Sequence, residues 1–389
     1  MEASRKLALI GPMGSGKSTL AKAYGAQKAV TVFDTDEMFE RRYGKISAYF
    51  ERCGERSFRR LEAELIQEAV NSSCGIIACG GGAVLDKRGM NALRSHCDIA
   101  YLHADEAVLR SRIESSDRPL KNELGSILVE RNALYERYAD HTINANRTPS
   151  DVLSELCEKT SAPRKNRYDV LLCDADETVL DFNRAMRFAL TETARSVGVR
   201  KSAEEVVAAY EKILPVVWGR LERGEITRDE LASMRFTMLK QSLNERFDVK
   251  LFNDEYFENI KKTRFVIDDA LCFLDCVRAR GIRVYIITNS YKAVADQRLK
   301  ALDGHIDGAF VSEDIGFDKP DARFFDGVFE SLGNPDKSRI MVFGDGAYPD
   351  IHGGAAYGTD TCLFDPKHTA VSDEADFTAH CYDDLLRIL

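Results

Sequence analysis

The sequence lacks the features that mark membrane, secreted and zinc-binding proteins. No apolar run approaches the ~18 residues that a membrane-spanning helix requires. Only one strand-length segment precedes the glycine-rich stretch that starts at Gly11, which leaves no room for a signal peptide. The ten cysteines include no CxxC pair, so neither a zinc site nor a disulfide framework is indicated. We therefore expect a cytoplasmic protein.

An excess of positive charge is also missing. The net charge of −9 argues against binding of nucleic acid or anionic membranes through bulk charge. The hydrophobic content of 44% and the charged content of 30% are those of an ordinary folded protein. At ~150 residues per domain, the 389 residues suggest two or three globular units. The expected partners are small molecules.

Short β-branched and apolar runs alternate with longer amphipathic stretches, a pattern typical of βα units and parallel sheets. In the first half the strand candidates are 6–10, 30–33, 75–79, 98–102 and 141–144. The polar, basic segment 158–167 contains a proline and shows no apolar periodicity, so it is the expected linker. It would join a first domain of residues 1–157 to a second domain of residues 168–389.

The second half begins with a strand candidate at 168–173 and continues with mainly helical periodicity. Strands resume at 283–287, 308–312, 339–343 and 359–364. A helical block inserted after the first strand of a sheet is the layout of a capped hydrolase. We expect this cap at about residues 185–265.

Residues 11–18 (GPMGSGKS) match the phosphate-binding motif GxxxxGK[ST], between an apolar strand and a helical stretch. Its glycines let backbone N–H groups curl around a phosphate at a helix N-terminus. Lys17 supplies a cation for the β- and γ-oxygens, and Ser18 supplies a hydroxyl ligand for Mg²⁺. ATP and Mg²⁺ are therefore the expected cofactors, and the expected nucleotide-binding residues here are Gly14, Ser15, Gly16, Lys17, Ser18 and Thr19.

Four further segments accompany this loop: 34–36 (DTD), 44–50 (GKISAYF), 54–62 (GERSFRRLE) and 80–82 (GGG). With them, residues 1–155 resemble the shikimate kinases. The resemblance implies an α/β fold with a five-stranded parallel sheet, of the P-loop type found in nucleoside monophosphate kinases. It also implies phosphorylation of shikimate by ATP, a step of aromatic amino acid biosynthesis.

The resemblance assigns roles to individual residues. Asp34 helps hold Mg²⁺, and Asp36 binds and orients the acceptor hydroxyl group. Taken alone, the two aspartates could equally be a helix N-cap and a turn residue. Arg59 and Arg131 grip the acceptor carboxylate, a task that suits the planar guanidinium group. The acceptor approaches closely at three residues without side chains, Gly80, Gly81 and Gly82.

Two segments match the nucleotide side of the same family. Arg118, in 118–120 (RPL), matches the start of a mobile lid and would reach the transferring phosphoryl group. Pro149, in 147–149 (RTP), matches the adenine-side loop. Arg112 has two open interpretations, a cover for the adenine or a surface salt bridge. The lid segment is short, and we expect the kinase unit to be monomeric.

In the second half, four segments follow strand candidates in order: 174–178 (DADET), 286–290 (IITNS), 317–320 (FDKP) and 344–350 (GDGAYPD). They resemble the four motifs of the haloacid-dehalogenase-type phosphatases, and the cap region most resembles the pyrimidine 5'-nucleotidase branch. The resemblance implies a Rossmann-like sheet with a helical cap and an Mg²⁺-dependent phosphatase.

In such a phosphatase, Asp174 is the nucleophile, and Asp176 first protonates the leaving alcohol and then activates water. Thr288 binds the transferring phosphoryl group, and Lys319 neutralises its charge. Gly346 stands where the family often has serine. The expected metal ligands are Asp174, Asp345, Asp350 and the carbonyl group of Asp176.

Within the cap, Trp218 and Arg235 are candidates to face the substrate, although helix packing and a solvated charge are the more ordinary interpretations. Two alternatives for the whole chain stay open. The second domain could be a non-catalytic regulatory module, or the first domain could phosphorylate another small polyol such as gluconate. Arg59 and Arg131 discriminate between shikimate and that second acceptor.

Overall fold

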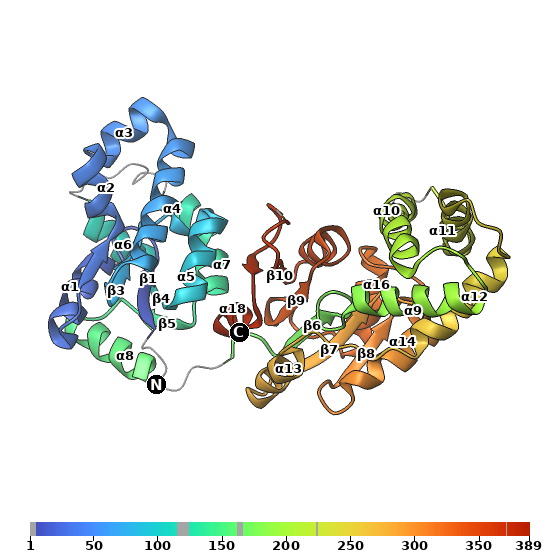
Figure 1. Ribbon diagram of the computed structural model, residues 1–389. Coiled ribbons are helices and arrows are strands. Elements are labelled where there is room, and N and C mark those ends of the chain that lie inside the picture. The colour runs from blue at the N-terminus through green and yellow to red at the C-terminus, as the bar shows by residue number, and fades with distance from the viewer. Residues whose placement is uncertain (1–4, 115–123, 162–165, 223–224, 371) are drawn as a thin grey trace. The chain divides into compact units, whose positions relative to one another are not determined.

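The structure, a computed structural model, describes residues 5–114, 124–161, 166–222, 225–370 and 372–389. The chain divides into two units, one of residues 1–167 with the last three residues and one of residues 168–386. Each unit is built on its own parallel sheet, so the predicted α/β class is confirmed (Figure 1). No helix within the described ranges is long and apolar enough to cross a membrane.

The first sheet has the strand order β2-β3-β1-β4-β5. Its central strand β1 pairs in parallel with β3 and β4. Four of the five β1 residues are buried, as a strand covered on both faces requires. All five predicted strands are present, as β1 (Lys6–Ile10), β2 (Val32–Asp34), β3 (Ile76–Ala78), β4 (Cys97–His103) and β5 (His141–Asn144).

Two apolar cores cover the two faces of this sheet. Ala8 and Ile10 of β1 belong to one core, and Leu7 and Leu9 belong to the other, as the alternation of side chains along a strand predicts. The surrounding helices are α1 (Lys17–Lys28), α2 (Thr35–Tyr43), α3 (Ile46–Cys53), α4 (Glu55–Asn71), η1 (Ala83–Leu85), α5 (Lys87–His96), α6 (Glu106–Ile113), α7 (Leu124–Tyr138) and α8 (Pro149–Ser161).

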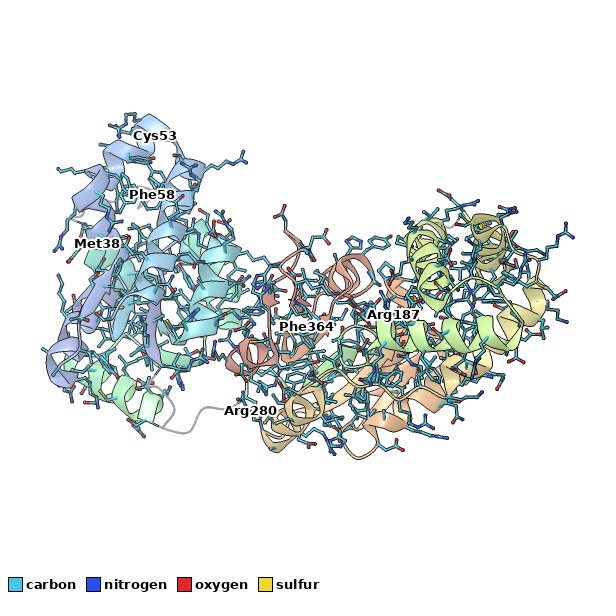
Figure 2. All side chains as sticks on the ribbon, viewed as in Figure 1. Met38, Cys53, Phe58, Arg187, Arg280 and Phe364 are labelled. Atoms are coloured by element: carbon cyan, nitrogen blue, oxygen red, sulfur yellow. The ribbon has the colours of Figure 1, made fainter. Side chains whose placement is uncertain are left out.

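A third, smaller apolar cluster joins α2 to α4. Phe39 of α2 packs on Phe58 of α4, with ring centroids 4.7 Å apart. Figure 2 shows Phe58 between the helices, whereas Cys53 lies exposed at the end of α3. This cluster fixes the position of α4, which carries several residues of the acceptor motif.

The expected linker requires a correction at its start. Residues 158–161 form the last turn of α8, which ends at Ser161. The apolar side chains Val152 and Leu156 bury one face of this helix against the sheet, so it continues past the point where the sequence becomes polar. Residues 162–165 lie outside the described ranges.

The second sheet has the strand order β11-β10-β9-β6-β7-β8, and every neighbouring pair is parallel. The five predicted strands are present, and the three-residue edge strand β11 was not predicted. The strands are β6 (Val170–Asp174), β7 (Arg283–Thr288), β8 (Gly308–Val311), β9 (Ile340–Gly344), β10 (Asp360–Phe364) and β11 (Phe377–Ala379).

The predicted helical block consists of α9 (Phe182–Ser196), α10 (Ala203–Glu222), α11 (Arg228–Leu243) and α12 (Val249–Lys261). These helices share an apolar core that includes Tyr210, Phe236 and Phe252. In Figure 1 they lie together, in green and yellow, beside the second sheet. A capping box between Thr227 and Glu230 starts α11, as its sequence pattern favours.

The remaining elements of the second unit surround its sheet and carry the motif loops. They are α13 (Ala270–Ala279), α14 (Lys292–Arg298), η3 (Leu299–Leu302), α15 (Ser312–Ile315), α16 (Ala322–Ser331), η4 (Lys337–Arg339), the π-helical turn η5 (Ala347–His352), α17 (Gly353–Tyr357) and α18 (Tyr382–Ile388). In both units the loops with polar motifs follow the carboxyl ends of strands, where parallel sheets bind ligands.

Candidate active sites

The loop between β1 and α1 borders a cavity of about 400 Å³. Gly14 and Gly16 have φ angles of 80° and 94°, which glycine adopts without strain. Lys17 is buried, and its Nζ donates to the carbonyl groups of Gly11 at 2.7 Å and Pro12 at 2.9 Å. The cavity wall includes seven of the eight residues predicted to bind the nucleotide: Gly14, Ser15, Gly16, Lys17, Ser18, Thr19 and Pro149.

Asp34 serves as an N-cap and also keeps an oxygen available. Its Oδ1 accepts hydrogen bonds from the backbone N–H groups of Asp36 at 3.0 Å and Glu37 at 3.1 Å, which starts α2. Its Oδ2 is buried and has no hydrogen-bond partner among the described residues. A cation near Ser18 would satisfy this oxygen, since Mg²⁺ prefers oxygen ligands. The two interpretations of Asp34 are therefore compatible.

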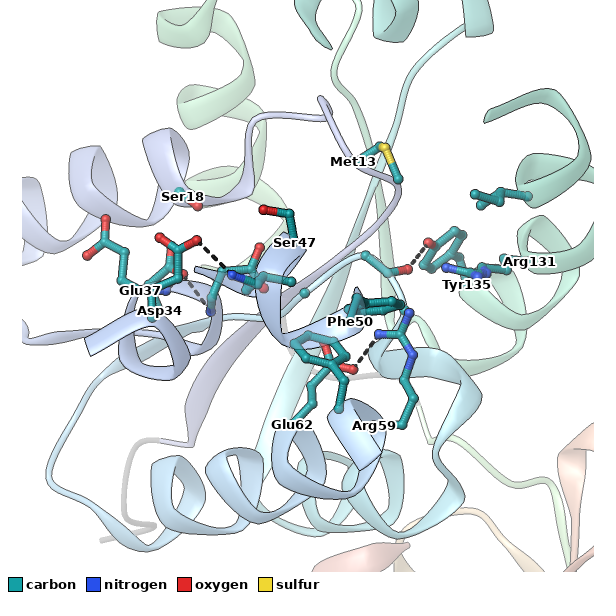
Figure 3. A pocket seen from close by; sticks show the side chains of 18 residues that line it. Met13, Ser18, Asp34, Glu37, Ser47, Phe50, Arg59, Glu62, Arg131 and Tyr135 are labelled. Atoms are coloured by element: carbon teal, nitrogen blue, oxygen red, sulfur yellow. Dashed lines mark hydrogen bonds and ion pairs between the residues drawn. The ribbon is translucent and has the colours of Figure 1, made fainter. Parts of the chain in front are cut away.

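A second cavity of about 370 Å³ adjoins the first, because Ser18 and Asp36 line both. Arg59 and Glu62 of α4 reach this cavity, as do Arg131 and Tyr135 of α7 (Figure 3). Asp34 lies toward the left of that view, and Arg59 and Arg131 lie toward the right. In that view Asp34 lies on the same side of the cavity as Ser18, and the guanidinium groups of Arg59 and Arg131 lie on the other side.

Arg59 is held in place by acidic neighbours. Its Nη1 donates to Glu62 Oε2 at 2.7 Å, and its Nη2 donates to Glu55 Oε1 at 2.9 Å. Glu62 is only 2% exposed, and burial raises its pKa while Arg59 opposes that shift. Arg131 is 5% exposed, and its Nε has no hydrogen-bond partner within the described part of the chain. A small carboxylate would complete this arrangement.

The glycine triplet after β3 makes room for these side chains. A Cβ atom on Gly80 would lie 2.8 Å from Asp36 Oδ1 and still closer to Glu62 Oε1. A Cβ atom on Gly82 would lie within 3.0 Å of Cζ, Nη1 and Nη2 of Arg59. The Gly81 carbonyl accepts a hydrogen bond from Tyr135 Oη. The triplet therefore leaves space for Asp36 and Glu62 beside Gly80 and for Arg59 beside Gly82.

Arg118 and Arg112 are the two arginines that the sequence suggests for the nucleotide side. Arg118 lies outside the described residues. Arg112 lines the nucleotide cavity and donates to the carbonyl groups of Ala145 at 3.0 Å and Gly14 at 3.5 Å. Arg112 is therefore part of the cavity wall.

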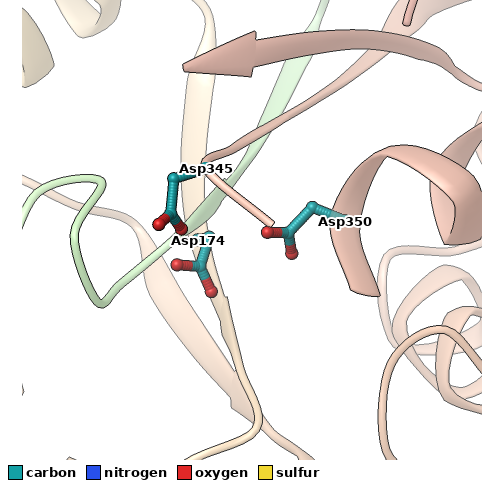
Figure 4. A group of neighbouring side chains, drawn as sticks. All are labelled: Asp174, Asp345 and Asp350. Atoms are coloured by element: carbon teal, nitrogen blue, oxygen red, sulfur yellow. The ribbon is translucent and has the colours of Figure 1, made fainter. Parts of the chain in front are cut away.

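The second candidate site lies in a cavity of about 760 Å³ at the carboxyl edge of the second sheet. Asp174 ends β6, Asp345 follows β9, and Asp350 lies in η5. Their carboxylate oxygens approach within 4.8 Å of one another (Figure 4). Lys319 Nζ lies 2.7 Å from Asp174 Oδ1 and 2.6 Å from Asp350 Oδ1. The four charged groups form one cluster.

This cluster can hold a divalent cation. Burial raises the pKa of Asp174 to about 6, Lys319 opposes that shift, and Asp350 adds to it. Three carboxylates facing one ammonium group leave an excess of negative charge, and hard cations such as Mg²⁺ prefer oxygen ligands. The residues present therefore fit the expected metal ion.

Two threonines and a glycine shape this cluster. Thr178 Oγ1 donates to Asp174 Oδ2 at 3.4 Å and accepts from the Asp345 backbone N–H at 3.1 Å. Thr288 ends β7, is buried and lines the cavity. A Cβ atom on Gly346 would lie 2.7 Å from Asp350 Oδ2 and 2.6 Å from Pro349 Cγ. This chain therefore has no room for the serine that the family often carries there.

Asp176 forms an ion pair that the sequence did not reveal. Its Oδ1 lies 2.5 Å from Nη1 of Arg298, the last residue of α14. Desolvation raises the pKa of Asp176, and Arg298 opposes that shift. The two residues are 122 positions apart. A lone arginine at the end of a helix is usually a solvated charge that favours the helix dipole, so no pattern pointed to it.

The cap supplies the apolar wall of the same cavity, including Trp218 of α10 and Phe257 of α12. Arg235 of α11 also lines the cavity and is only 6% exposed. Its Cζ lies 5.2 Å from the ring centroid of Phe257 and 5.0 Å from that of Tyr256. Its Nη2 donates to Asn253 Oδ1 at 3.2 Å. Arg235 is thus a buried cation of the cavity wall.

These two sites define two classes of enzyme in one chain, a P-loop kinase followed by a capped hydrolase with an aspartate cluster. The shikimate kinase family matches residues 13–161, and the haloacid dehalogenase-like hydrolase family matches residues 168–358. The shikimate kinase of Thermobifida fusca is 36% identical over 164 residues, which cover 40% of this chain and 95% of that protein.

Relatives of the second half belong to the hydrolases. The pyrimidine 5'-nucleotidase YjjG of Escherichia coli is 30% identical over 52% of this chain and 88% of that protein. The structure of YfnB, a Bacillus subtilis protein assigned to the HAD-hydrolases and bound to magnesium, is 29% identical with a TM-score of 0.54. That match covers 57% of this chain and 99% of YfnB. The chain therefore belongs to the shikimate kinases in its first half and to the haloacid dehalogenase-like hydrolases in its second.

Proposed function

We propose that the first domain transfers the γ-phosphoryl group of ATP to shikimate, as a step of aromatic amino acid biosynthesis. The observation that carries this proposal is the meeting of the nucleotide cavity and the acceptor cavity at Ser18 and Asp36. A phosphoryl group can pass directly between ligands placed in two cavities that join.

In this mechanism the two ends of the acceptor are held separately. Arg59 and Arg131 bind the carboxylate group, which fixes the hydroxyl group beside Asp36. Asp36 orients that hydroxyl group and accepts its proton as the oxygen bonds to the γ-phosphorus and the bond from that phosphorus to the leaving oxygen of ADP breaks. Lys17 stabilises the charge on the β- and γ-phosphate oxygens. Mg²⁺, held by Ser18 and Asp34, would neutralise the same charge, and Pro149 and Arg118 belong to the ATP side.

Steady-state kinetics of the full chain test this assignment. ADP formation should depend on shikimate, and Arg59→Met or Arg131→Met should raise the KM for shikimate by about tenfold or more. The KM for ATP should stay close to the wild-type value. Arg42→Met is the matched control, because Arg42 pairs with Glu68 between α2 and α4 on an exposed surface. Turnover of gluconate without turnover of shikimate would contradict the proposal.

We further propose that the second domain hydrolyses a phosphomonoester through an aspartyl-phosphate. The Asp174 oxygen attacks phosphorus, the bond to the leaving oxygen breaks, and Asp176 protonates the released alcohol. Water then attacks phosphorus and gives its proton to Asp176, and the bond to Asp174 breaks. Lys319 and Thr288 stabilise the phosphoryl oxygens throughout. Mg²⁺, held by Asp174, Asp345, Asp350 and the Asp176 carbonyl, would reduce the repulsion between nucleophile and phosphate.

The cap favours a nucleotide as substrate. Trp218 and Phe257 offer aromatic faces to a planar base, and the buried guanidinium group of Arg235 offers donors to its carbonyl oxygens. The similarity to YjjG supports a pyrimidine nucleoside monophosphate.

Phosphate release from a panel of nucleoside monophosphates and sugar phosphates tests this choice. Pyrimidine nucleotides should be hydrolysed best by the wild-type chain. Asp174→Asn should abolish release and leave shikimate kinase activity unchanged. Turnover by Asp174→Asn would disprove the nucleophile, and a wild-type chain without any phosphatase activity would favour a regulatory module instead.

A further inference from the structure

We propose that Arg298 is a positioning residue that holds the Asp176 carboxylate in place to protonate the leaving oxygen. This inference rests on the phosphatase function proposed above. It adds a residue from α14, an element outside the four motifs that define the hydrolase site.

The first support is the geometry of the ion pair. Arg298 Nη1 lies 2.5 Å from Asp176 Oδ1, and the Arg298 side chain is 4% exposed, while that of Asp176 is 33% exposed. The arginine is therefore fixed inside the protein, and the carboxylate reaches from it toward the open cavity. Both residues line the same cavity as Asp174 and Lys319.

The second support is a nitrogen of Arg298 that is not satisfied. Its Nη2 is buried and has no hydrogen-bond partner among the residues that the structure describes. A buried donor without an acceptor costs free energy. The hydrogen bond from Nη1 to Asp176 therefore matters more for holding the guanidinium group in place, as a positioning role requires.

The third support is the anchoring of α14 itself. Val294 of this helix belongs to the apolar core of the cap, and α14 packs against α12. Phe182, at the start of α9, lies beside the guanidinium group, with its ring centroid 5.6 Å from Arg298 Cζ. Arg298 therefore sits where the cap and the sheet meet and has little freedom to move.

The need for a proton from Asp176 depends on the leaving group of the substrate. When the Asp174 oxygen bonds to phosphorus, the bond between phosphorus and the leaving oxygen breaks, and the proton of Asp176 passes to that oxygen. An alkoxide such as the 5'-oxygen of a nucleoside needs this proton, whereas p-nitrophenolate leaves readily as an anion. Displacement of the Asp176 carboxylate should therefore slow hydrolysis of the nucleotide far more than hydrolysis of p-nitrophenyl phosphate.

The test compares kcat/KM of full-length Arg298→Gln on a pyrimidine nucleoside monophosphate and on p-nitrophenyl phosphate. This constant includes only steps up to the release of the alcohol, so the later hydrolysis of the aspartyl-phosphate does not enter. We expect a fall of about 100-fold for the nucleotide and of less than about fivefold for p-nitrophenyl phosphate. Arg298→Lys, which keeps the charge, should restore part of the nucleotide activity.

Controls separate positioning from folding. The ratio of the two constants is measured within one variant, so it does not depend on the folded fraction. Arg339→Gln removes an exposed Arg–Asp pair with Asp169 outside the cavity and should leave the ratio unchanged. In an Asp176→Asn background, Arg298→Gln should add little further loss of nucleotide turnover.

Two results would overturn the inference while leaving the phosphatase function intact. One is an equal fall for both substrates in Arg298→Gln and Arg298→Lys, which would assign Arg298 a purely structural role. The other is an additive loss in the double variant. A wild-type chain that hydrolyses neither substrate would instead refute the proposed phosphatase function.

Discussion

Replacing Gly82 by alanine should damage the acceptor site of the kinase domain without unfolding it. The backbone at Gly82 has φ −104° and ψ 4°, which alanine can adopt. The new methyl group would lie within 3.0 Å of three guanidinium atoms of Arg59. Because these atoms end a flexible side chain, we expect Arg59 to move and the backbone to remain in place.

The displaced Arg59 would lose its bond to Glu62 at 2.7 Å and its place in the acceptor cavity. A hydrogen bond to a charged group contributes about 1.5–3 kcal/mol, and each 1.4 kcal/mol corresponds to about a tenfold change in affinity. We therefore expect the KM for shikimate to rise by about 10- to 100-fold. The KM for ATP should change little, because Gly82 does not line the nucleotide cavity.

A coupled assay of ADP formation, with shikimate and ATP varied in turn, measures both constants. Gly89→Ala is the matched control, because its Cβ atom would lie 3.2 Å from Ile66 Cδ1, within the same domain but outside the cavity. Thermal melting of both variants checks the fold. A KM for shikimate within about twofold of wild type in a folded Gly82→Ala protein would refute this reasoning.

Three further predictions concern the hydrolase site and the proposed Mg²⁺ dependence of both activities. Lys319→Met should lower kcat for p-nitrophenyl phosphate by about 100-fold or more, since it removes the cation between Asp174 and Asp350; an unchanged kcat would contradict its role. Gly346→Ser should raise the Mg²⁺ concentration needed for half-maximal phosphatase activity, because its Cβ atom would crowd Asp350 Oδ2; an unaltered Mg²⁺ titration would argue against this. Chelation of divalent cations should stop both activities, and added Mg²⁺ should restore them, with turnover in excess EDTA as the opposing result.

Much of the fold could be predicted because its strands are buried on both faces. Continuous apolar runs such as β1 and β6 are hard to place anywhere except inside a parallel sheet, and polar motifs directly after them must lie at its carboxyl edge. For the same reason Asp174, Thr288 and Asp345 line one cavity, although they are far apart in sequence. For these residues, strand order alone determines proximity.

The features that could not be predicted depend on side-chain packing. Arg298 reaches Asp176 only because α14 packs against the cap, and a single arginine carries no periodic pattern. The crowding of Gly82 by Arg59 likewise requires the positions of α4 and η1 relative to each other. The edge strand β11 has three residues, too few to show an alternation of apolar and polar side chains.

The lysines of the two candidate sites differ in the contacts that they make. Lys17 donates to the carbonyl oxygens of Gly11 and Pro12, contacts that a phosphate group can replace. Lys319 is bound between the carboxylates of Asp174 and Asp350, so the protein already neutralises its charge. A phosphate dianion can therefore bind at the first site through the backbone N–H groups of loop 11–18 and the Lys17 side chain. It can enter the second only when additional positive charge offsets the aspartate cluster, because like charges in a partly buried site repel strongly. We therefore expect the hydrolase site to require a divalent cation for phosphate to bind, and the kinase site to require it for phosphoryl transfer.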